Sequence, residues 1–183
     1  MSDPAHAPAG AGATAVLLPA FLAILAAQRA WELIVSSRNT RRLLARGARE
    51  HGRGHLAPLI LLHALFPCAL LVEVLALRSH PGALAPLWAA LWLAAQWLRW
   101  ASMRALGGRW SIRVLVLPGE PLVRHGVYRW LRHPSYVAVG IELLAGPLLF
   151  GAWRTALAFS AVNAIALRVR IRCEERALAG AAA

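Results

Sequence analysis

The side chains best suited to chemistry lie in two short motifs near the C-terminal end of the sequence. The first is RHPSY, residues 132–136. Proline favours the first turn of a helix and disfavours helical backbone in the residue before it, so Pro134 predicts that a helix starts here. The free backbone amides at such a start suit a carboxylate ligand. The same pattern also fits a helix cap with interfacial Tyr and Trp anchors, and both interpretations stay open.

The second motif is RVRIRCEERAL, residues 168–178. It places Arg170 and Glu174 four residues apart on one helical face, with Glu175 turned away from that face. Negative charge is disfavoured near a helix C-terminus, and arginine before glutamate is the weaker order for an internal ion pair. The pattern therefore favours a Glu174 that serves another cation or hydrogen-bond donor, while a solvated charge run with an internal salt bridge is the alternative.

The elements that position these motifs are long apolar stretches. Of the 183 residues, 59% are hydrophobic and 15% are charged, against roughly a quarter charged in a soluble domain. Five stretches approach the length of a membrane-spanning helix: residues 14–35, 56–77, 84–106, 135–150 and 153–172. We therefore expect an all-α, polytopic integral membrane protein with about five transmembrane helices, the last two forming a tight hairpin.

One membrane domain, residues 1–183, accounts for this pattern. Residues 1–108 supply the first three helices, and residues 109–183 carry both motifs. No arginine or lysine precedes Arg29, so the first apolar run lacks the positive leader of a secretory signal and predicts a retained membrane helix. Cys68 and Cys173 form no disulfide framework and no metal-type spacing, so no metal site is expected.

Charge is distributed unevenly along the chain. All 20 basic residues are arginines, and with 8 acids they leave a formal charge of +12. These arginines cluster between apolar runs instead of covering a soluble fold, so we expect no nucleic-acid partner. The loops at residues 36–55 and 104–133 carry six arginines each and the C-terminal end four, against one in each opposite connection. Because basic loops stay cytoplasmic, this predicts a membrane protein with its N-terminus outside and its C-terminus in the cytoplasm.

Two polar segments between the spans have predicted structure of their own. The first is RNTRRLLARGARE at residues 38–50, which we expect to form a short helix on anionic headgroups as a surface anchor. In the second, residues 110–136, β-branched residues at 112–117 and the turn-forming Pro118-Gly119 predict a short strand or hairpin before Leu122. This stretch is rich in Arg, His and Tyr, which predicts a cytoplasmic cofactor-binding loop region.

Three ionisable residues inside the apolar spans are functional candidates, because such groups cost roughly 2.5–3.5 kcal/mol to insert when charged. Glu73 and Glu142 lie near span ends or a helix start, where they are expected to reach the interface or pair with arginine. His63 is expected to be a core histidine with its hydrogen bond satisfied.

Together the motifs resemble the isoprenylcysteine carboxyl methyltransferase family, integral membrane enzymes that use S-adenosylmethionine. The resemblance rests on GVYRWLRHPSY (126–136), a hairpin with Gly140 and Gly146, and RxxxEExxL (170–178), and it covers about residues 109–178. The segments WELIVSSRNTRRLLARGARE and LPGEPLV are more similar to a bacterial branch whose members methylate alkylresorcinol or alkylpyrone lipids. RHPxY alone also resembles membrane sterol reductases and phospholipid methyltransferases.

The resemblance implies a cofactor pocket and a substrate-facing residue. The pocket residues would be Glu120, Pro121, Leu122, Val123, Tyr128, His133, Pro134, Ser135, Tyr136 and Glu174. Arg170 would face the substrate as the catalytic residue. The chemistry agrees, because the cofactor's ammonium and ribose hydroxyls suit Glu174, its carboxylate suits His133 and the helix-start amides, and its adenine suits tyrosine rings.

The implied function is O-methylation of a lipophilic acceptor at the membrane, either isoprenylcysteine carboxylate-like or of alkylresorcinol or alkylpyrone type. Eukaryotic relatives continue past the EE motif with a cytosolic helix, whereas this sequence ends nine residues after Glu174. The part of the cofactor lid or substrate site that this helix forms in those relatives is therefore expected to be absent here, or to be formed by another segment or molecule. The alternatives are a sterol-type NADPH-dependent membrane reductase, a phospholipid N-methyltransferase and a non-enzymatic membrane scaffold.

Overall fold

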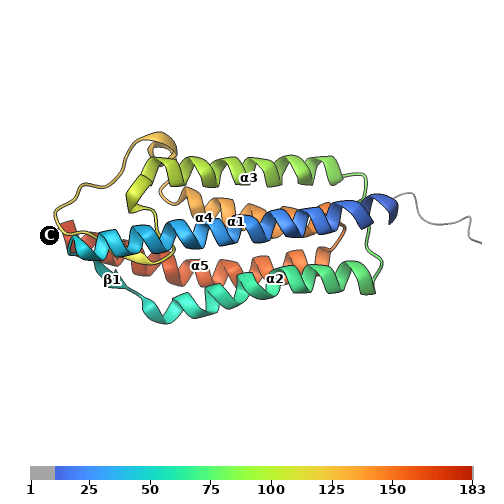
Figure 1. The fold of residues 1–183 in the computed structure, drawn as a ribbon, viewed down its shortest axis with the longest axis horizontal. Coiled ribbons are helices and arrows are strands. Elements are labelled where there is room, and N and C mark those ends of the chain that lie inside the picture. The colour runs from blue at the N-terminus through green and yellow to red at the C-terminus, as the bar shows by residue number, and fades with distance from the viewer. Residues whose placement is uncertain (1–10, 183) are drawn as a thin grey trace, which may run out of the picture.

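The computed structural model describes residues 11–182, which form five α-helices and a two-stranded sheet at one end of the resulting bundle (Figure 1). The helices are α1 (Ala11–Ala45), α2 (Leu56–Ala76), α3 (Ala85–Leu106), α4 (Pro134–Leu149) and α5 (Trp153–Ala182). The strands are β1 (Arg49–His51) and β2 (Val114–Val116), and short 3-10 turns are η1 (Arg53–His55), η2 (Gly107–Arg109) and η3 (Gly126–Arg129). Each predicted apolar stretch falls on one helix, so the all-α fold is confirmed.

The five helices differ in how well each would cross a membrane by itself. Thr14–Ala45 and α2 are long and apolar enough to do so. α4 is apolar but has 16 residues, while α3 carries two arginines and α5 carries five. Residues 11–182 thus contain two candidate spans of full length within a helical bundle, which is consistent with an all-α membrane protein.

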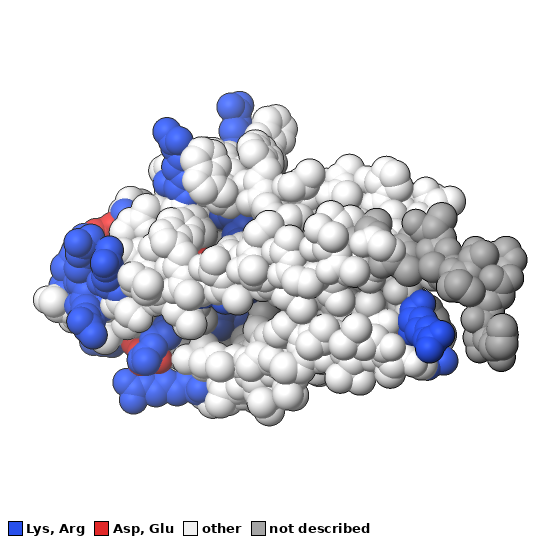
Figure 2. All heavy atoms as spheres, turned by 45° about the vertical axis from the view of Figure 1, so that its right-hand side comes forward, with Lys and Arg blue, Asp and Glu red and all other residues white. Residues whose placement is uncertain are grey.

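Successive helices run in alternating directions along the bundle, as Figure 1 shows. The end of α1, the sheet, the loop between α3 and α4, and the end of α5 therefore meet at one end, which we call the basic end. On the face drawn in Figure 2, most of the arginine atoms lie at this end, and a broad uncharged region covers the middle of the bundle. The alternation brings RHPSY, at the start of α4, to the same end as RCEER, near the end of α5.

The core lies inside the bundle and draws on all five helices or their ends. Its buried members are Leu18, Phe21, Leu25, Leu62, Phe66, Leu70, Val74, Trp92, Leu143, Ala145, Phe150 and Ala152. Phe21 contacts the rings of Trp92 and Phe150, with centroids 5.1 and 5.3 Å apart. Gly146 allows this approach of α1 to α4, since a Cβ there would stand 3.0 Å from the Phe21 ring. The glycine of the predicted hairpin motif therefore has a packing role.

The predicted hairpin of the last two helices is confirmed, and residues 150–152 join α4 to α5. Gly151 adopts a φ of +72°, which a residue with a side chain rarely accepts. A Cβ at this position would also lie 2.5 Å from the His80 carbonyl oxygen in the α2–α3 connection. Glycine is therefore required both by the backbone and by the close contact between the two connections.

The predicted separate anchor helix in residues 38–50 is wrong. α1 continues to Ala45 without a break, and the chain then enters β1. Asn39 and Leu43 are buried, and Asn39 Nδ2 donates a hydrogen bond of 2.8 Å to the Trp110 carbonyl. One face of the segment packs on the loop after α3, so tertiary contacts extend the helix that the charge pattern alone would place on headgroups.

The predicted short strand is confirmed at β2, but its partner is not local. β2 pairs antiparallel with β1, with Arg49 opposite Val116 and His51 opposite Val114. Pro118 and Gly119 still form a turn, in which the Glu120 amide donates to the Leu117 carbonyl at 3.3 Å. No hairpin closes across this turn, and the sheet instead ties the end of α1 to the loop between α3 and α4.

Candidate active site

α4 begins at the place that RHPSY predicts. Pro134 is the first residue of the helix. The backbone amide of Tyr136 donates to the His133 carbonyl at 3.0 Å. The His133 ring also stacks on the Tyr136 ring, with 5.3 Å between centroids and 11° between planes. The helix start therefore holds an imidazole and a phenol face to face.

The Tyr136 hydroxyl joins this helix start to the end of α5. It donates a hydrogen bond to Glu174 Oε2 and accepts one of 2.8 Å from Arg170 Nε. The guanidinium of Arg170 lies over the Tyr136 ring, 5.4 Å from its centroid, and donates through Nη2 to the Ile112 carbonyl. No direct ion pair links Arg170 to Glu174 among the described residues. Because Arg170 precedes Glu174, the sequence favoured a partner for Glu174 other than this arginine. The Tyr136 hydroxyl is that partner.

His133 lies between two carboxylates. Its Nε2 is 3.3 Å from Glu175 Oε1, and its Nδ1 is 3.8 Å from Glu174 Oε2. The exposed fractions of the three side chains are 17% for His133, 29% for Glu174 and 50% for Glu175. A ligand at the basic end can therefore reach both acids. We refer to His133, Tyr136, Arg170, Glu174 and Glu175 as the α4–α5 cluster.

Tyr128, on η3, belongs to the same neighbourhood. Burial raises the pKa of Tyr128 to about 12, the nearby Ser135 side chain opposes the rise, and the Glu174 charge adds to it. The phenol consequently stays neutral at physiological pH and can act as a donor or a flat surface. The structure brings Tyr128, Ser135 and the buried Pro134 together with the α4–α5 cluster.

The segment Glu120-Pro121-Leu122-Val123 is held by arginines from elsewhere in the chain. Glu120 pairs with Arg46, just after α1, and with Arg109 of η2. Arg109 Nη1 also donates to the Pro121 carbonyl at 2.7 Å. These contacts fasten the segment at the basic end, but no hydrogen bond or ion pair in the described residues joins it to the α4–α5 cluster.

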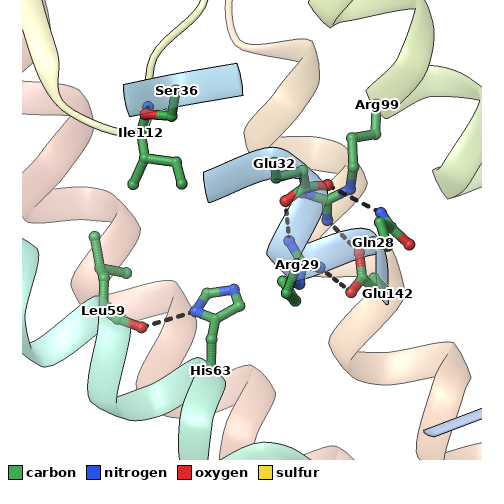
Figure 3. Close-up of polar contacts among 9 residues, drawn as sticks. All are labelled: Gln28, Arg29, Glu32, Ser36, Leu59, His63, Arg99, Ile112 and Glu142. Carbon is green, nitrogen blue, oxygen red and sulfur yellow. Dashed lines mark hydrogen bonds and ion pairs between the residues drawn. The ribbon is translucent and has the colours of Figure 1, made fainter. Parts of the chain in front are cut away.

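A second polar cluster lies inside the bundle, where Figure 3 shows side chains of α1, α3 and α4 converging. Glu142, which is 1% exposed, accepts hydrogen bonds from Arg29 and Arg99. Glu32 is 2.6 Å from Arg29 Nη1 and 3.5 Å from Arg99 Nη1. Two guanidiniums thus face two carboxylates, and the network is neutral overall.

Of the four residues in this network, only Glu142 was expected from the sequence. The predicted arginine pairing of Glu142 is confirmed, but Arg29, Glu32 and Arg99 were passed over. The sequence contains a pattern that could have identified them. Each is a charged residue inside a predicted apolar span, where unpaired charge is costly. Arg29 and Glu32 are also spaced for one helical face.

The other two intramembrane candidates have structural partners. His63 Nδ1 lies 2.8 Å from the Leu59 carbonyl, as expected for a histidine with its hydrogen bond satisfied. Glu73 accepts hydrogen bonds from the backbone amides of Arg154 and Thr155, at 3.1 and 2.6 Å. The carboxylate therefore caps the N-terminus of α5, where free amides and the helix dipole favour negative charge, instead of pairing with an arginine side chain.

Comparison with known proteins gives a consistent result. The family described as the isoprenylcysteine carboxyl methyltransferase (ICMT) family matches residues 88–180, which begin in α3 and include the whole α4–α5 cluster. The uncharacterized protein YpbQ of Bacillus subtilis (strain 168) is 40% identical over 157 residues, or 86% of this chain and 94% of that protein. An uncharacterized protein of Haemophilus influenzae is 27% identical over 157 residues, or 85% of this chain and 91% of that protein. No solved structure matches the chain.

Proposed function

Since the chain belongs to the isoprenylcysteine carboxyl methyltransferase family, we propose that it transfers a methyl group from S-adenosylmethionine to an oxygen of a lipophilic acceptor. The observation that carries the proposal is the α4–α5 cluster. It gathers two accessible carboxylates, an imidazole, a phenol and a guanidinium at the basic end of an apolar bundle. An acceptor in the bilayer would reach this cluster from the membrane side.

The groups present fit the chemistry of the proposed cofactor. Glu174 is only partly used by the Tyr136 hydroxyl, so its other oxygen suits an ammonium or ribose hydroxyls. The His133 imidazole suits a carboxylate, whereas the Tyr136 and Val137 amides at the start of α4 already donate to the His133 carbonyl. Tyr128 supplies a ring face for adenine, since the Tyr136 ring already stacks on His133 and lies under the Arg170 guanidinium. When bound, the cofactor would supply an electrophilic methyl group that the acceptor oxygen attacks in line with S-adenosylhomocysteine as the leaving group, so the main task of the protein is alignment.

Arg170 has a positioning role within this proposal. It is 6% exposed, and its donors to Tyr136 and Ile112 hold the phenol against Glu174. On the acceptor side, a guanidinium would favour the oxyanion form of a phenol or enol and would orient a carboxylate. We propose that Arg170 performs both roles. It holds Tyr136 against Glu174 for the cofactor, and from the same helical face it acts on the oxygen of the acceptor.

Arg170→Lys is expected to lower acceptor turnover while S-adenosylhomocysteine still binds, because lysine keeps the charge but loses the planar fork. Steady-state kinetics with each substrate varied in turn, together with a cofactor titration, would measure both effects. Normal turnover would leave Arg170 as a structural charge. A parallel loss of cofactor affinity would mean that Arg170 acts only through Tyr136.

We further propose that all five helices cross the bacterial inner membrane, with the N-terminus outside and the C-terminus in the cytoplasm. The alternating helix directions and the concentration of arginines at the basic end favour this topology. A C-terminal reporter that is active only outside the cytoplasm is expected to stay silent, and one active only inside should give signal. The opposite pattern would overturn the proposed orientation.

The acceptor we propose is an isoprenylcysteine carboxylate-like lipid or an alkylresorcinol or alkylpyrone. Its apolar part would enter from the bilayer, and its oxygen would approach Arg170. Incubating the purified protein with methyl-labelled S-adenosylmethionine and each acceptor class should place the label on oxygen. Label on the nitrogen of phosphatidylethanolamine would instead favour a phospholipid N-methyltransferase.

A cofactor titration tests the reaction class directly. The full chain in nanodiscs is expected to bind S-adenosylhomocysteine and not NADPH. Binding of NADPH instead would favour a sterol-type reductase, and binding of neither would favour a membrane scaffold. Both of these outcomes would contradict the proposed methyl transfer.

A further inference from the structure

A groove made of two adjoining cavities runs along the side of α5 at the basic end. Its first part, a cavity of about 710 Å³, lies between the β1–β2 sheet and α5. Its second part, about 670 Å³, lies between the start of α2 and the middle of α5. Gly52 and Val169 line both parts, so the two form one groove, which we call the α5 groove.

The two parts of the α5 groove differ in chemistry. The part farther from the basic end is apolar, and its lining includes Val162 and Ile165, which are 53% and 68% exposed. The part at the basic end is lined by Arg49, Arg172 and Arg176. In the described residues these three side chains enter no ion pair or hydrogen bond, and no acidic residue lines either part. The groove is therefore apolar at one end and cationic at the other.

The α5 groove is separate from the α4–α5 cluster. Arg172 and Arg176 each follow a cluster residue, Arg170 or Glu174, by two positions. In a helix with 3.6 residues per turn, two positions correspond to a rotation of about 200°. Arg172 and Arg176 therefore project from nearly the opposite face of α5 to Arg170 and Glu174, and no residue of the α4–α5 cluster lines either part of the groove.

We propose that the α5 groove binds one anionic phospholipid, with its phosphate on Arg49, Arg172 and Arg176 and an acyl chain along the apolar part. Guanidinium groups pair well with phosphate oxygens, and these three have no competing carboxylate. The cationic part lies at the basic end and the apolar part toward the middle of the bundle, which is the orientation of a lipid in the adjacent leaflet. The apolar part selects a lipid over a soluble phosphate.

Cys173 lines the groove and provides a native probe of its occupancy. In a Cys68→Ser variant it is the single thiol, since the sequence has two cysteines. We would measure the labelling rate of Cys173 by an uncharged maleimide in the full chain, in nanodiscs of phosphatidylcholine with and without phosphatidylglycerol. Phosphatidylglycerol is expected to slow labelling by about tenfold when it is present at roughly ten times its Kd.

Charge variants separate specific binding from a general surface effect. Arg172→Gln/Arg176→Gln and, independently, Arg49→Gln are expected to remove most of the slowing. Arg168→Gln, which removes a charge from the same helix outside the groove, should retain it. The ratio of rates in the two nanodiscs is compared within each variant, so changes in the intrinsic reactivity of the thiol cancel.

Three results would overturn the proposal: equal labelling rates in the two nanodiscs, slowing that persists in both charge variants, or equal protection by inorganic phosphate in phosphatidylcholine nanodiscs. The last result would mean that the apolar part contributes nothing. Because the measurement involves neither the cofactor nor an acceptor, its failure would leave the proposed methyl transfer standing. Failure of the methyl transfer would likewise leave the lipid site standing.

Discussion

Replacing Glu142 with glutamine is expected to lower the free energy of unfolding by about 3–5 kcal/mol, the range for breaking a buried ion pair by removing one partner. Glu142 is 1% exposed and accepts hydrogen bonds from both Arg29 and Arg99. Without its charge, the buried guanidinium of Arg99 and the partly buried guanidinium of Arg29 would face only the carboxylate of Glu32. Glutamine has nearly the same shape, so the loss would reflect charge rather than packing.

Unfolding in detergent micelles by heat or by added denaturing detergent would measure this loss. Glu175→Gln is the matched control, because its side chain is 50% exposed and its effect should stay within about 0.5 kcal/mol. A double variant, Arg99→Met/Glu142→Leu, removes one charge of each sign and leaves the pair of Arg29 and Glu32. It should be more stable than the single variant, since apolar replacement of a buried pair is often neutral. A single variant as stable as the native protein would contradict the assignment.

The network also bears on the site at the basic end. It joins α1 and α3 to α4, and α4 begins with the residues that hold His133 and Tyr136 in place. A shift of α4 along the bundle would move both rings relative to α5. The network is therefore expected to position the α4–α5 cluster without touching a substrate.

Glu174→Ala and His133→Ala are each expected to weaken S-adenosylhomocysteine binding by about 1.5–3 kcal/mol, or roughly 10- to 150-fold in Kd. This is the range for hydrogen bonds that involve a charged group. The Glu174→Ala variant would lose the carboxylate that contacts the ammonium or ribose and that accepts the hydrogen bond from the Tyr136 hydroxyl. The His133→Ala variant would lose a hydrogen-bond donor to the carboxylate of the cofactor and the ring that stacks on Tyr136.

Isothermal titration of the full chain in nanodiscs would measure these affinities. Arg172→Gln is a suitable control, because it alters the charge of the same helix on the face turned away from Glu174, and it should leave the affinity unchanged. Wild-type affinity in both correctly folded variants would remove Glu174 and His133 from the cofactor pocket. Equal weakening by the control would mean that the net charge of the basic end, and not the cluster, governs binding.

The sequence by itself determined the features that depend on neighbouring residues. Apolar length located α2 and α3 to within one residue at each end, because hydropathy and helix length are local properties. Pro134 located the start of α4, because proline restricts its own backbone and that of the preceding residue. The order of Arg170 and Glu174 indicated that the acid would have a partner other than the arginine, and the motifs led to the family that the comparisons show.

Only the tertiary structure decided which distant residues meet. β2 pairs with β1, and the paired residues Arg49 and Val116 are 67 positions apart in the sequence. The local turn at Pro118 had suggested a hairpin instead. The residues that neutralise Glu142 come from two other helices, and the donor to Glu174 comes from the start of α4. Such contacts depend on how whole helices pack, because a buried charge or an unpaired strand edge is satisfied by whatever partner the bundle brings within reach. Periodicity and propensity describe one segment at a time and do not contain that information.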